Sequence, residues 1–247
     1  MESPRGQARR TWLAHLLDFA FPRVCPVCRR ASDRPERHLC TDCRMRLPVY
    51  DGPVCARCGA IPVGNVGNRD FTCGTCRNAR PAFDRARSAA RFAGGVRDMI
   101  LAFKYNHATW LREDLADLLE GCVRARLDAG EIDVVAPVPL HPSRLRSRTY
   151  NQSDLLARSL ARRLDCPYRP DLLARTRATS TQTRLGAGGR RLNVRDAFAL
   201  SEPEWASGRT ILLVDDVMTT GATLHECARI LRAASPVRIW CATLARD

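Results

Sequence analysis

The segment from residue 209 to residue 224, RTILLVDDVMTTGATL, constrains the fold more than any other part of the chain. An apolar run meets two acids, Asp215 and Asp216, and a turn rich in hydroxyls and glycine follows at residues 219–223. This pattern predicts a buried strand that ends at a turn opening a helix, which is where open α/β sheets bind ligands. Backbone N–H groups at a helix start suit a phosphate, and carboxylates suit sugar hydroxyls or magnesium. We therefore predict a site for a phosphorylated ribose.

Two other interpretations of the acid pair carry less support. A Walker-B-like magnesium site is accompanied by a Gly-x-x-x-x-Gly-Lys-Ser/Thr loop, which this sequence lacks. A receiver-type acidic cluster is disfavoured by the Thr-Thr-Gly-Ala-Thr turn that follows the acids.

Several motifs resemble a known family. The segment 209–224 is similar to the signature of type I phosphoribosyltransferases, which bind phosphoribosyl pyrophosphate (PRPP). From about Leu16 to Leu244 the chain resembles the ComF family of competence-associated proteins. The motifs are DVVAPVPLHP at 133–142, RTYNQ at 148–152, Gln182, RRLNV at 190–194, AF at 197–198 and the paired cysteines near the N-terminus. Thr149 stands where the family usually has glycine, and a β-branched residue tolerates fewer backbone conformations.

The resemblance implies roles for particular residues. Asp215 and Asp216 would hold the ribose 2′- and 3′-hydroxyls. The 5′-phosphate would lie in the cradle formed by Thr219, Thr220, Gly221, Ala222 and Thr223. Residues 140–148 would form a pyrophosphate loop that starts at Leu140 and offers Arg144 or Arg148 as charge partners, with magnesium on the pyrophosphate. Lys104 and Tyr105 match a Lys-Tyr motif of the family, to which we assign no role from the sequence.

Eight of the twelve cysteines form four pairs with Cys-x-x-Cys spacing. Successive pairs predict two Cys₄ zinc sites. The ligands would be Cys25, Cys28, Cys40 and Cys43 at one site, and Cys55, Cys58, Cys73 and Cys76 at the other. Interleaved pairing, iron–sulfur ligation and His38 as a competing ligand are the alternatives. Zinc would supply folding energy to a segment with few large apolar residues.

The remaining cysteines and the N-terminal segment bear on the compartment. Four isolated cysteines, Cys122, Cys166, Cys227 and Cys241, are interpreted as buried small residues. The apolar patch within residues 1–20 is too short and too broken for a membrane span, and it predicts an amphipathic helix. Without a secretory signal, disulfides are disfavoured and a cytoplasmic location is expected.

The net charge of +14 is unevenly placed. Two zinc–tetrathiolate centres, each of formal charge −2, lower it to about +10. Residues 141–195 hold thirteen arginines against three aspartates. This excess suits either a small polyanionic ligand or a nucleic-acid backbone. Because only Tyr150 and Tyr168 interleave with these arginines, no strong base-stacking platform is predicted.

Periodicity and chain breakers predict an α/β protein with a parallel sheet built from right-handed βαβ units. The expected domains are an N-terminal amphipathic helix at 1–20, a double zinc-binding module at 21–80 and a phosphoribosyltransferase-like domain at 81–247. Strands are expected at 83–92, 132–138, 209–214 and 237–244, and helices at 96–105, 110–127, 152–164 and from 224 to about 234. A loop is expected between the second strand and the helix at 152.

Transfer chemistry is harder to predict than binding. Residues 177–191 form a candidate lid with Gln182 and Arg184 as groups that could close over the site. The first turn position is Thr219, which cannot act as a carboxylate base, and the lid has no lysine. Three hypotheses follow: a PRPP-binding protein in DNA uptake that handles single-stranded DNA beside competence-machinery proteins, a phosphoribosyltransferase with an amine or base acceptor, and a PRPP-sensing regulator without turnover.

Overall fold

The computed structural model describes residues 23–62, 64, 67, 71–178 and 187–247. Its strands are β1 (Arg85–Arg91), β2 (Val134–Pro137), β3 (Leu173–Arg175), β4 (Phe198–Leu200), β5 (Thr210–Met218) and β6 (Arg238–Arg246). Its α-helices are α2 (Thr41–Met45), α3 (Gly74–Asn78), α4 (Gly94–Tyr105), α5 (Arg112–Arg126), α6 (Pro142–Arg148), α7 (Gln152–Leu164), α8 (Ala187–Val194) and α9 (Ala222–Leu231). Three-residue turns of 3₁₀ type lie between some of them, including η1 (Thr109–Leu111) and η5 (Arg232–Ala234).

The chain divides into two compact units, Met1–Arg46 and Leu47–Asp247. The division falls between the two sets of paired cysteines, so each unit contains one set. A domain boundary near residue 80 therefore stays a prediction, and the helix expected at 1–20 lies outside the described residues. Among the described residues, no helix is both long enough and apolar enough to cross a membrane.

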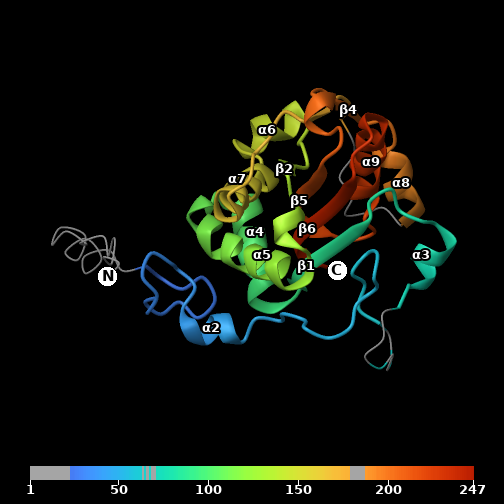
Figure 1. Ribbon diagram of the computed structural model, residues 1–247. Coiled ribbons are helices and arrows are strands. Elements are labelled where there is room, and N and C mark those ends of the chain that lie inside the picture. The colour runs from blue at the N-terminus through green and yellow to red at the C-terminus, as the bar shows by residue number, and fades with distance from the viewer. Residues whose placement is uncertain (1–22, 63, 65–66, 68–70, 179–186) are drawn as a thin grey trace, which may run out of the picture. The chain divides into compact units, whose positions relative to one another are not determined.

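The larger unit is built on a four-stranded parallel sheet with the order β1-β6-β5-β2. Figure 1 shows helices α4, α5 and α7 on one face of this sheet and α8 and α9 on the other. The parallel α/β architecture predicted from the alternation of strands and helices is confirmed. In such a sheet the carboxyl ends of the strands share one edge, where the ligand site is expected.

Local chemistry explains why the central elements form. The apolar run Ile211–Val214 is fully buried in β5, as expected for an inner parallel strand. Helix α7 begins after Asn151, whose side chain accepts a hydrogen bond from the Ser153 N–H at 3.1 Å. Its termination at Asp165, which has a left-handed backbone, matches the predicted boundaries 152–164.

Two expectations about the central strands were wrong. Strand β5 does not end at Val214 but continues to Met218, because β6 is equally long and pairs with it as far as Met218 opposite Arg246. The segment after β2 is not a loop throughout, because helix α6 occupies residues 142–148. Pro142 suits the first helical turn, and the His141 ring accepts from the Ser143 N–H at 3.2 Å, so the proline starts a helix instead of preventing one.

A second, two-stranded sheet pairs β3 with β4 in antiparallel orientation. The sequence did not predict this pair, because both strands are only three residues long. The segment that joins β3 and β4 contains the candidate lid at 177–191 and helix α8. Residues 179–186, including Gln182 and Arg184, lie outside the described residues.

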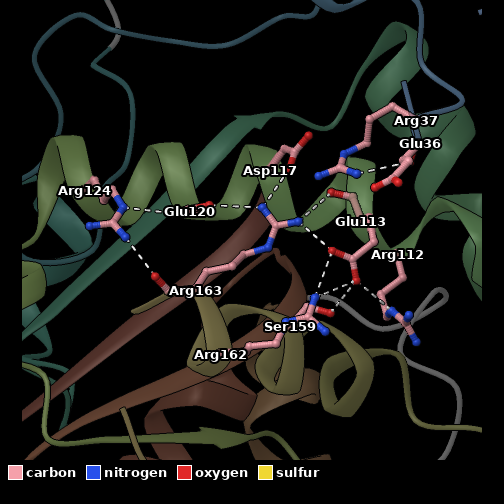
Figure 2. A network of polar contacts seen from close by, with 10 residues as sticks. All are labelled: Glu36, Arg37, Arg112, Glu113, Asp117, Glu120, Arg124, Ser159, Arg162 and Arg163. Atoms are coloured by element: carbon pink, nitrogen blue, oxygen red, sulfur yellow. Dashed lines mark hydrogen bonds and ion pairs between the residues drawn. The ribbon is translucent and has the colours of Figure 1, made fainter. Parts of the chain in front are cut away.

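A buried ion-pair network joins α5 to α7. The Arg163 guanidinium on α7 lies 2.6 Å from Glu113, 2.7 Å from Asp117 and 3.0 Å from Glu120, all on α5. Figure 2 shows the three carboxylates converging on this one cation. Since the Arg163 side chain is only 15% exposed, the network holds the two helices together on the same face of the sheet.

Candidate functional site

The two acids of β5 are held by different partners. Asp215 Oδ1 accepts a hydrogen bond from the Ser153 hydroxyl at 2.8 Å and another from the Asp216 N–H at 2.9 Å. Asp216 Oδ1 lies 2.9 Å from the Lys104 ammonium, and both side chains are largely buried. Elements far apart in sequence, α4, α7 and β5, therefore converge on adjacent carboxylates.

The environment of Asp215 opposes its ionisation. Burial is the largest cause, and the neighbouring Asp216 carboxylate adds to it, so the pKa of Asp215 lies well above its ordinary value. The Ser153 hydroxyl, the Asp216 N–H and the Lys104 charge act in the opposite direction without reversing the shift. A ligand that donates hydrogen bonds to this carboxylate, as sugar hydroxyls do, would favour its charged form.

The turn at 219–223 follows β5 directly and opens helix α9. Gly221 adopts a left-handed backbone (φ +74°), and the helix begins at Ala222. The Ala222 N–H points to the Thr220 hydroxyl at 3.4 Å. A hollow of about 30 Å³ lies in the turn and is lined by Asp215 and residues 217–224. Backbone N–H groups at a helix start are the kind of donors that suit a phosphate oxygen.

A cavity of about 400 Å³ brings most of the predicted site together. Its lining includes the predicted residues Leu140, Arg144, Arg148, Asp215, Asp216, Thr219 and Thr223. Thr220, Gly221 and Ala222 line the adjoining hollow in the turn. Arg144 and Arg148 reach the cavity from helix α6, so the pyrophosphate loop of the sequence prediction is in large part a helix.

The cavity also contains six polar residues that the sequence analysis did not assign to it: Lys104, Tyr105, Gln152, Ser153, Arg175 and Asp247. Lys104 could have been suspected because it is the only lysine of the chain. Arg175 comes from β3, is 9% exposed and lies over the Phe198 ring at 5.2 Å. Burial lowers the pKa of Arg175, and the nearby Arg144 charge lowers it further. No sequence signal separates Arg175 from the other arginines of this region.

The backbone of Thr149 explains why glycine is usual at this position in the family. It ends α6 with a left-handed backbone (φ +65°), the conformation for which glycine is favoured. Its N–H donates to the Leu145 carbonyl at 2.8 Å, and its hydroxyl donates to the Arg148 carbonyl at 2.6 Å. The turn keeps its hydrogen bonds despite the β-branched side chain.

The eight paired cysteines form two compact thiol clusters in consecutive order. Cys25, Cys28, Cys40 and Cys43 make one, and Cys55, Cys58, Cys73 and Cys76 make the other, with all Sγ atoms in a cluster within 4.8 Å of one another. Interleaved pairing is therefore wrong, and His38 is outside both clusters. The Cys28–Cys40 and Cys58–Cys73 Sγ distances of 3.8 and 3.6 Å agree with the roughly 3.8 Å edge of a zinc–tetrathiolate tetrahedron.

One thiol in each cluster has a lowered pKa, which favours the thiolate that metals bind, whereas burial raises the pKa of Cys43 and Cys76. The Arg30 N–H lowers the pKa of Cys28 to about 6. Burial disfavours the Cys55 thiolate, but the N–H groups of Cys73, Cys58 and Arg57 outweigh it and bring its pKa to about 6 as well. Of the isolated cysteines, Cys122, Cys227 and Cys241 are buried as predicted, whereas Cys166 is only half-buried.

Comparison with known proteins agrees with this geometry. Residues 16–77 match the model of the double zinc ribbon domain, and residues 152–247 match that of the phosphoribosyl transferase domain. The fold and the site thus define a phosphoribosyltransferase-like protein with an N-terminal double zinc ribbon.

The relatives define the family more narrowly. Competence protein F of Haemophilus influenzae is 32% identical over 223 residues, which cover 87% of this chain and 94% of that protein. DNA utilization protein YhgH of Escherichia coli K12 is 33% identical over 228 residues, which cover 90% and 97%. The chain belongs to this ComF family, as its motifs predicted. Among solved structures, the B. subtilis glutamine PRPP amidotransferase aligns with 56% of this chain and 26% of its own at 22% identity and a TM-score of 0.37.

Proposed function

We propose that this protein binds PRPP together with magnesium in the 400 Å³ cavity and acts in DNA uptake, where it handles single-stranded DNA. One observation carries the proposal: the Asp215–Asp216 pair, the turn at 219–223, and Arg144 and Arg148 of α6 line two adjoining hollows that share Asp215, Thr219 and Thr223. Carboxylates, helix-start N–H groups and guanidinium groups are the recognition chemistry that a ribose, a monophosphate and a pyrophosphate require.

Each part of the ligand has a proposed partner. The ribose 2′- and 3′-hydroxyls would donate to Asp215 and Asp216, and the 5′-phosphate would accept from the N–H groups of residues 219–223. Arg144 and Arg148 would pair with the pyrophosphate, whose charge magnesium would also neutralise. Ser153 and Lys104 would orient the two carboxylates, at 2.8 and 2.9 Å respectively.

These residues support PRPP binding better than phosphoribosyl transfer, because no acid–base catalyst is identified among them. Thr219 stands at the first turn position, where it cannot act as a carboxylate base, and residues 177–191 contain no lysine. Transfer to an acceptor that needs no deprotonation, such as ammonia or an amine, would use the same cavity. Release of pyrophosphate from PRPP across a panel of amines and bases distinguishes that activity from binding alone.

The proposed role in DNA uptake draws on the names of two relatives, a competence protein and a DNA utilization protein. The arginine excess of residues 141–195 is partly taken up within the fold, since Arg163 binds acids of α5 and Arg169 stacks on Trp205. The three arginines of α6 lie at the cavity or on the exposed helix surface, where a strand could reach them. We place this activity in the cytoplasm, where thiols stay reduced, beside proteins of the competence machinery.

Calorimetry with PRPP and magnesium tests the central claim. Wild-type protein should bind with micromolar affinity, and the double variant Asp215→Asn/Asp216→Asn should show at least a hundredfold loss. A wild type that does not bind PRPP would overturn the proposal. Binding without pyrophosphate release but with a PRPP-dependent protein partner would identify a sensor, and binding with release would identify a transferase.

A further inference from the structure

The second thiol cluster is part of the core that supports the ligand site. Cys55, Cys58 and Cys76 belong to the same buried cluster as Met218, which precedes the phosphate turn at 219–223, and Ala222, which lies in that turn. The Ala86 N–H of strand β1 donates to the Arg57 carbonyl at 2.7 Å, so the first cysteine knuckle is hydrogen-bonded to the sheet.

Gly59 shows how closely this knuckle approaches the sheet. It has a left-handed backbone (φ +70°), and a Cβ at this position would lie 2.6 Å from the Ala86 carbonyl oxygen. Because backbone atoms cannot move aside easily, only glycine fits here. The second metal site and the sheet edge are therefore packed as one body within the larger unit.

Arg246, the last residue of β6, connects this metal site to the ligand site. Its Nη1 donates to the Cys58 carbonyl at 2.7 Å and lies 3.2 Å from Met218 Sδ. Its Nη2 lies 3.8 Å from Cys58 Sγ. Arg246 also pairs with Met218 in the β5–β6 register, so backbone and side chain both hold the two residues together.

Met218 in turn contacts the phosphate turn. It is 2% exposed, directly precedes Thr219, and its Cε lies 2.6 Å from where a Cβ on Gly221 would stand. The Asp247 N–H, one residue beyond Arg246, donates to the Met218 carbonyl at 3.2 Å, and Asp247 lines the ligand cavity. A displacement of Arg246 would therefore shift Met218 and, through it, the turn.

We propose that Arg246 couples the second Cys₄ zinc site to the phosphate turn at 219–223, so that zinc and a phosphate-bearing ligand bind cooperatively. Arg246 is a positioning residue. Its guanidinium would face a zinc–tetrathiolate centre of formal charge −2, and because it contacts both Cys58 and Met218, a change in the position of one shifts the other. The identity of the ligand as PRPP rests on the proposed function. The contact between Arg246 and the metal site is independent of it. Linkage requires each ligand to strengthen binding of the other by the same factor.

The first test measures zinc release from the full-length chain. A Cys25→Ser/Cys28→Ser background leaves one intact zinc site, and transfer of zinc to a chromophoric chelator is followed with and without PRPP and magnesium. The ligand should slow release about fivefold or more in this background. Arg246→Met should abolish that slowing, and Arg246→Lys should restore part of it. The matched control Arg238→Met, at the other end of β6, should keep the full effect.

The second test needs no ligand. In the same Cys25→Ser/Cys28→Ser background, cobalt(II) replaces zinc at the second site, and its sulfur-to-metal charge-transfer band reports the four thiolates, Cys58 among them. Arg246→Met should shift this band while Arg238→Met leaves it in place, with circular dichroism showing that both variants are folded. An unshifted band in Arg246→Met would overturn the contact with the metal site. PRPP binding that leaves zinc release unchanged would overturn the coupling, whereas a shifted band in a protein that does not bind PRPP would sink only the proposed ligand.

Discussion

The Lys104 ammonium lies 2.9 Å from Asp216 Oδ1 and joins the last turn of α4 to the end of β5. The Lys104 side chain is 16% exposed and that of Asp216 is 12% exposed, so the pair is shielded from solvent. One cation thus offsets part of the charge of two adjacent carboxylates. This contact gives a structural role to the Lys-Tyr motif, for which the sequence alone suggested none.

The two acids should respond oppositely to neutralisation. Because the pKa of Asp215 is raised, its charge opposes folding at neutral pH, and this penalty fades as the pH falls towards the unfolded-state value of about 4. Asp215→Asn should therefore stabilise the protein at pH 7 by about 1 kcal/mol. Asp216→Asn should destabilise it by about 2 kcal/mol, because Lys104 loses its partner. Urea unfolding at pH 7 and pH 5 measures both; equal effects of the two substitutions would contradict the assignment.

Removal of the cation should be compensated by removal of its acid. Lys104→Met should leave two neighbouring carboxylates uncompensated and lower stability by about 2 kcal/mol. The double variant Lys104→Met/Asp216→Asn should recover at least half of that loss, and the cycle of four proteins should give a coupling energy of about 1 kcal/mol or more. Additive effects would mean that the pair contributes nothing to stability.

Acid should weaken the junction between α5 and α7. Burial disfavours the Glu113 carboxylate, but Arg163 and Arg112 outweigh burial and lower its pKa to about 2. Since the folded pKa is depressed, its contribution is fully present above the unfolded pKa of about 4.3 and is lost as the pH falls to about 2. Glu113→Gln should cost about 1 kcal/mol at pH 7, a figure reduced for solvent screening because the side chain is 23% exposed.

The pH profile supplies the control for Glu113. Chemical unfolding of Glu113→Gln between pH 5 and pH 2 should show a flatter fall in stability than that of the wild type. Glu131 forms an exposed ion pair with Arg238, in which the Glu131 side chain is 43% exposed and that of Arg238 is 44% exposed. Glu131→Gln removes this pair and should change stability by less than about 0.5 kcal/mol. A profile for Glu113→Gln as steep as that of the wild type would show that other carboxylates govern the acid transition.

Thr149→Gly should stabilise the protein. A β-branched residue in the left-handed region costs about 1–2 kcal/mol, and glycine adopts it freely, although glycine also gains entropy in the unfolded chain. The net gain expected in thermal or urea unfolding is about 0.5–1 kcal/mol. Thr149→Ala keeps a Cβ and serves as the control; it should not stabilise. A loss of stability in Thr149→Gly would show that the hydroxyl bond to the Arg148 carbonyl outweighs the backbone cost.

Single-stranded DNA binding should depend on helix α6. Replacement of Arg144, Arg146 and Arg148 by glutamine should strongly weaken binding of a fluorescent oligonucleotide at low salt, with the slope of log affinity against log salt falling by about 2. The control removes equal charge elsewhere, with Arg97→Gln/Arg195→Gln/Arg238→Gln, and should retain most of the affinity. No binding by the wild type at low salt would remove DNA from the proposed function.

The strands and the turn at 219–223 were predictable because their signals are local. Residues 211–214 are continuously apolar, and the hydroxyl-rich turn follows at once, so strand, turn and helix were placed together. The extension of β5 to Met218 was not predictable, because it depends on pairing with β6, more than twenty residues further along the chain. Helix α6 was missed because three prolines nearby indicated a loop, although Pro142 occupies a position where proline starts helices.

The site's supporting residues were missed for a different reason. Ser153, Lys104 and Arg175 reach the acids or their cavity from three separate elements, and only the fold brings these elements together. Arginine is so frequent in this chain that Arg175 carries no individual signal. The consecutive cysteine pairs, by contrast, were assigned to the correct clusters, because ligands close in sequence are restricted to nearby positions in space.

The order of the sheet dictates when this protein can finish folding. Strand β1 is the first to be synthesised, but its neighbour in the sheet is β6, and Arg85 pairs with Trp240. On the ribosome, β1 must therefore wait for nearly the whole chain before it can pair. Contacts between such distant parts close slowly and leave apolar edges exposed meanwhile. A nascent chain that stops before β6 should remain accessible to chaperones and proteases, with the knuckle of Cys55 and Cys58 lacking Arg246.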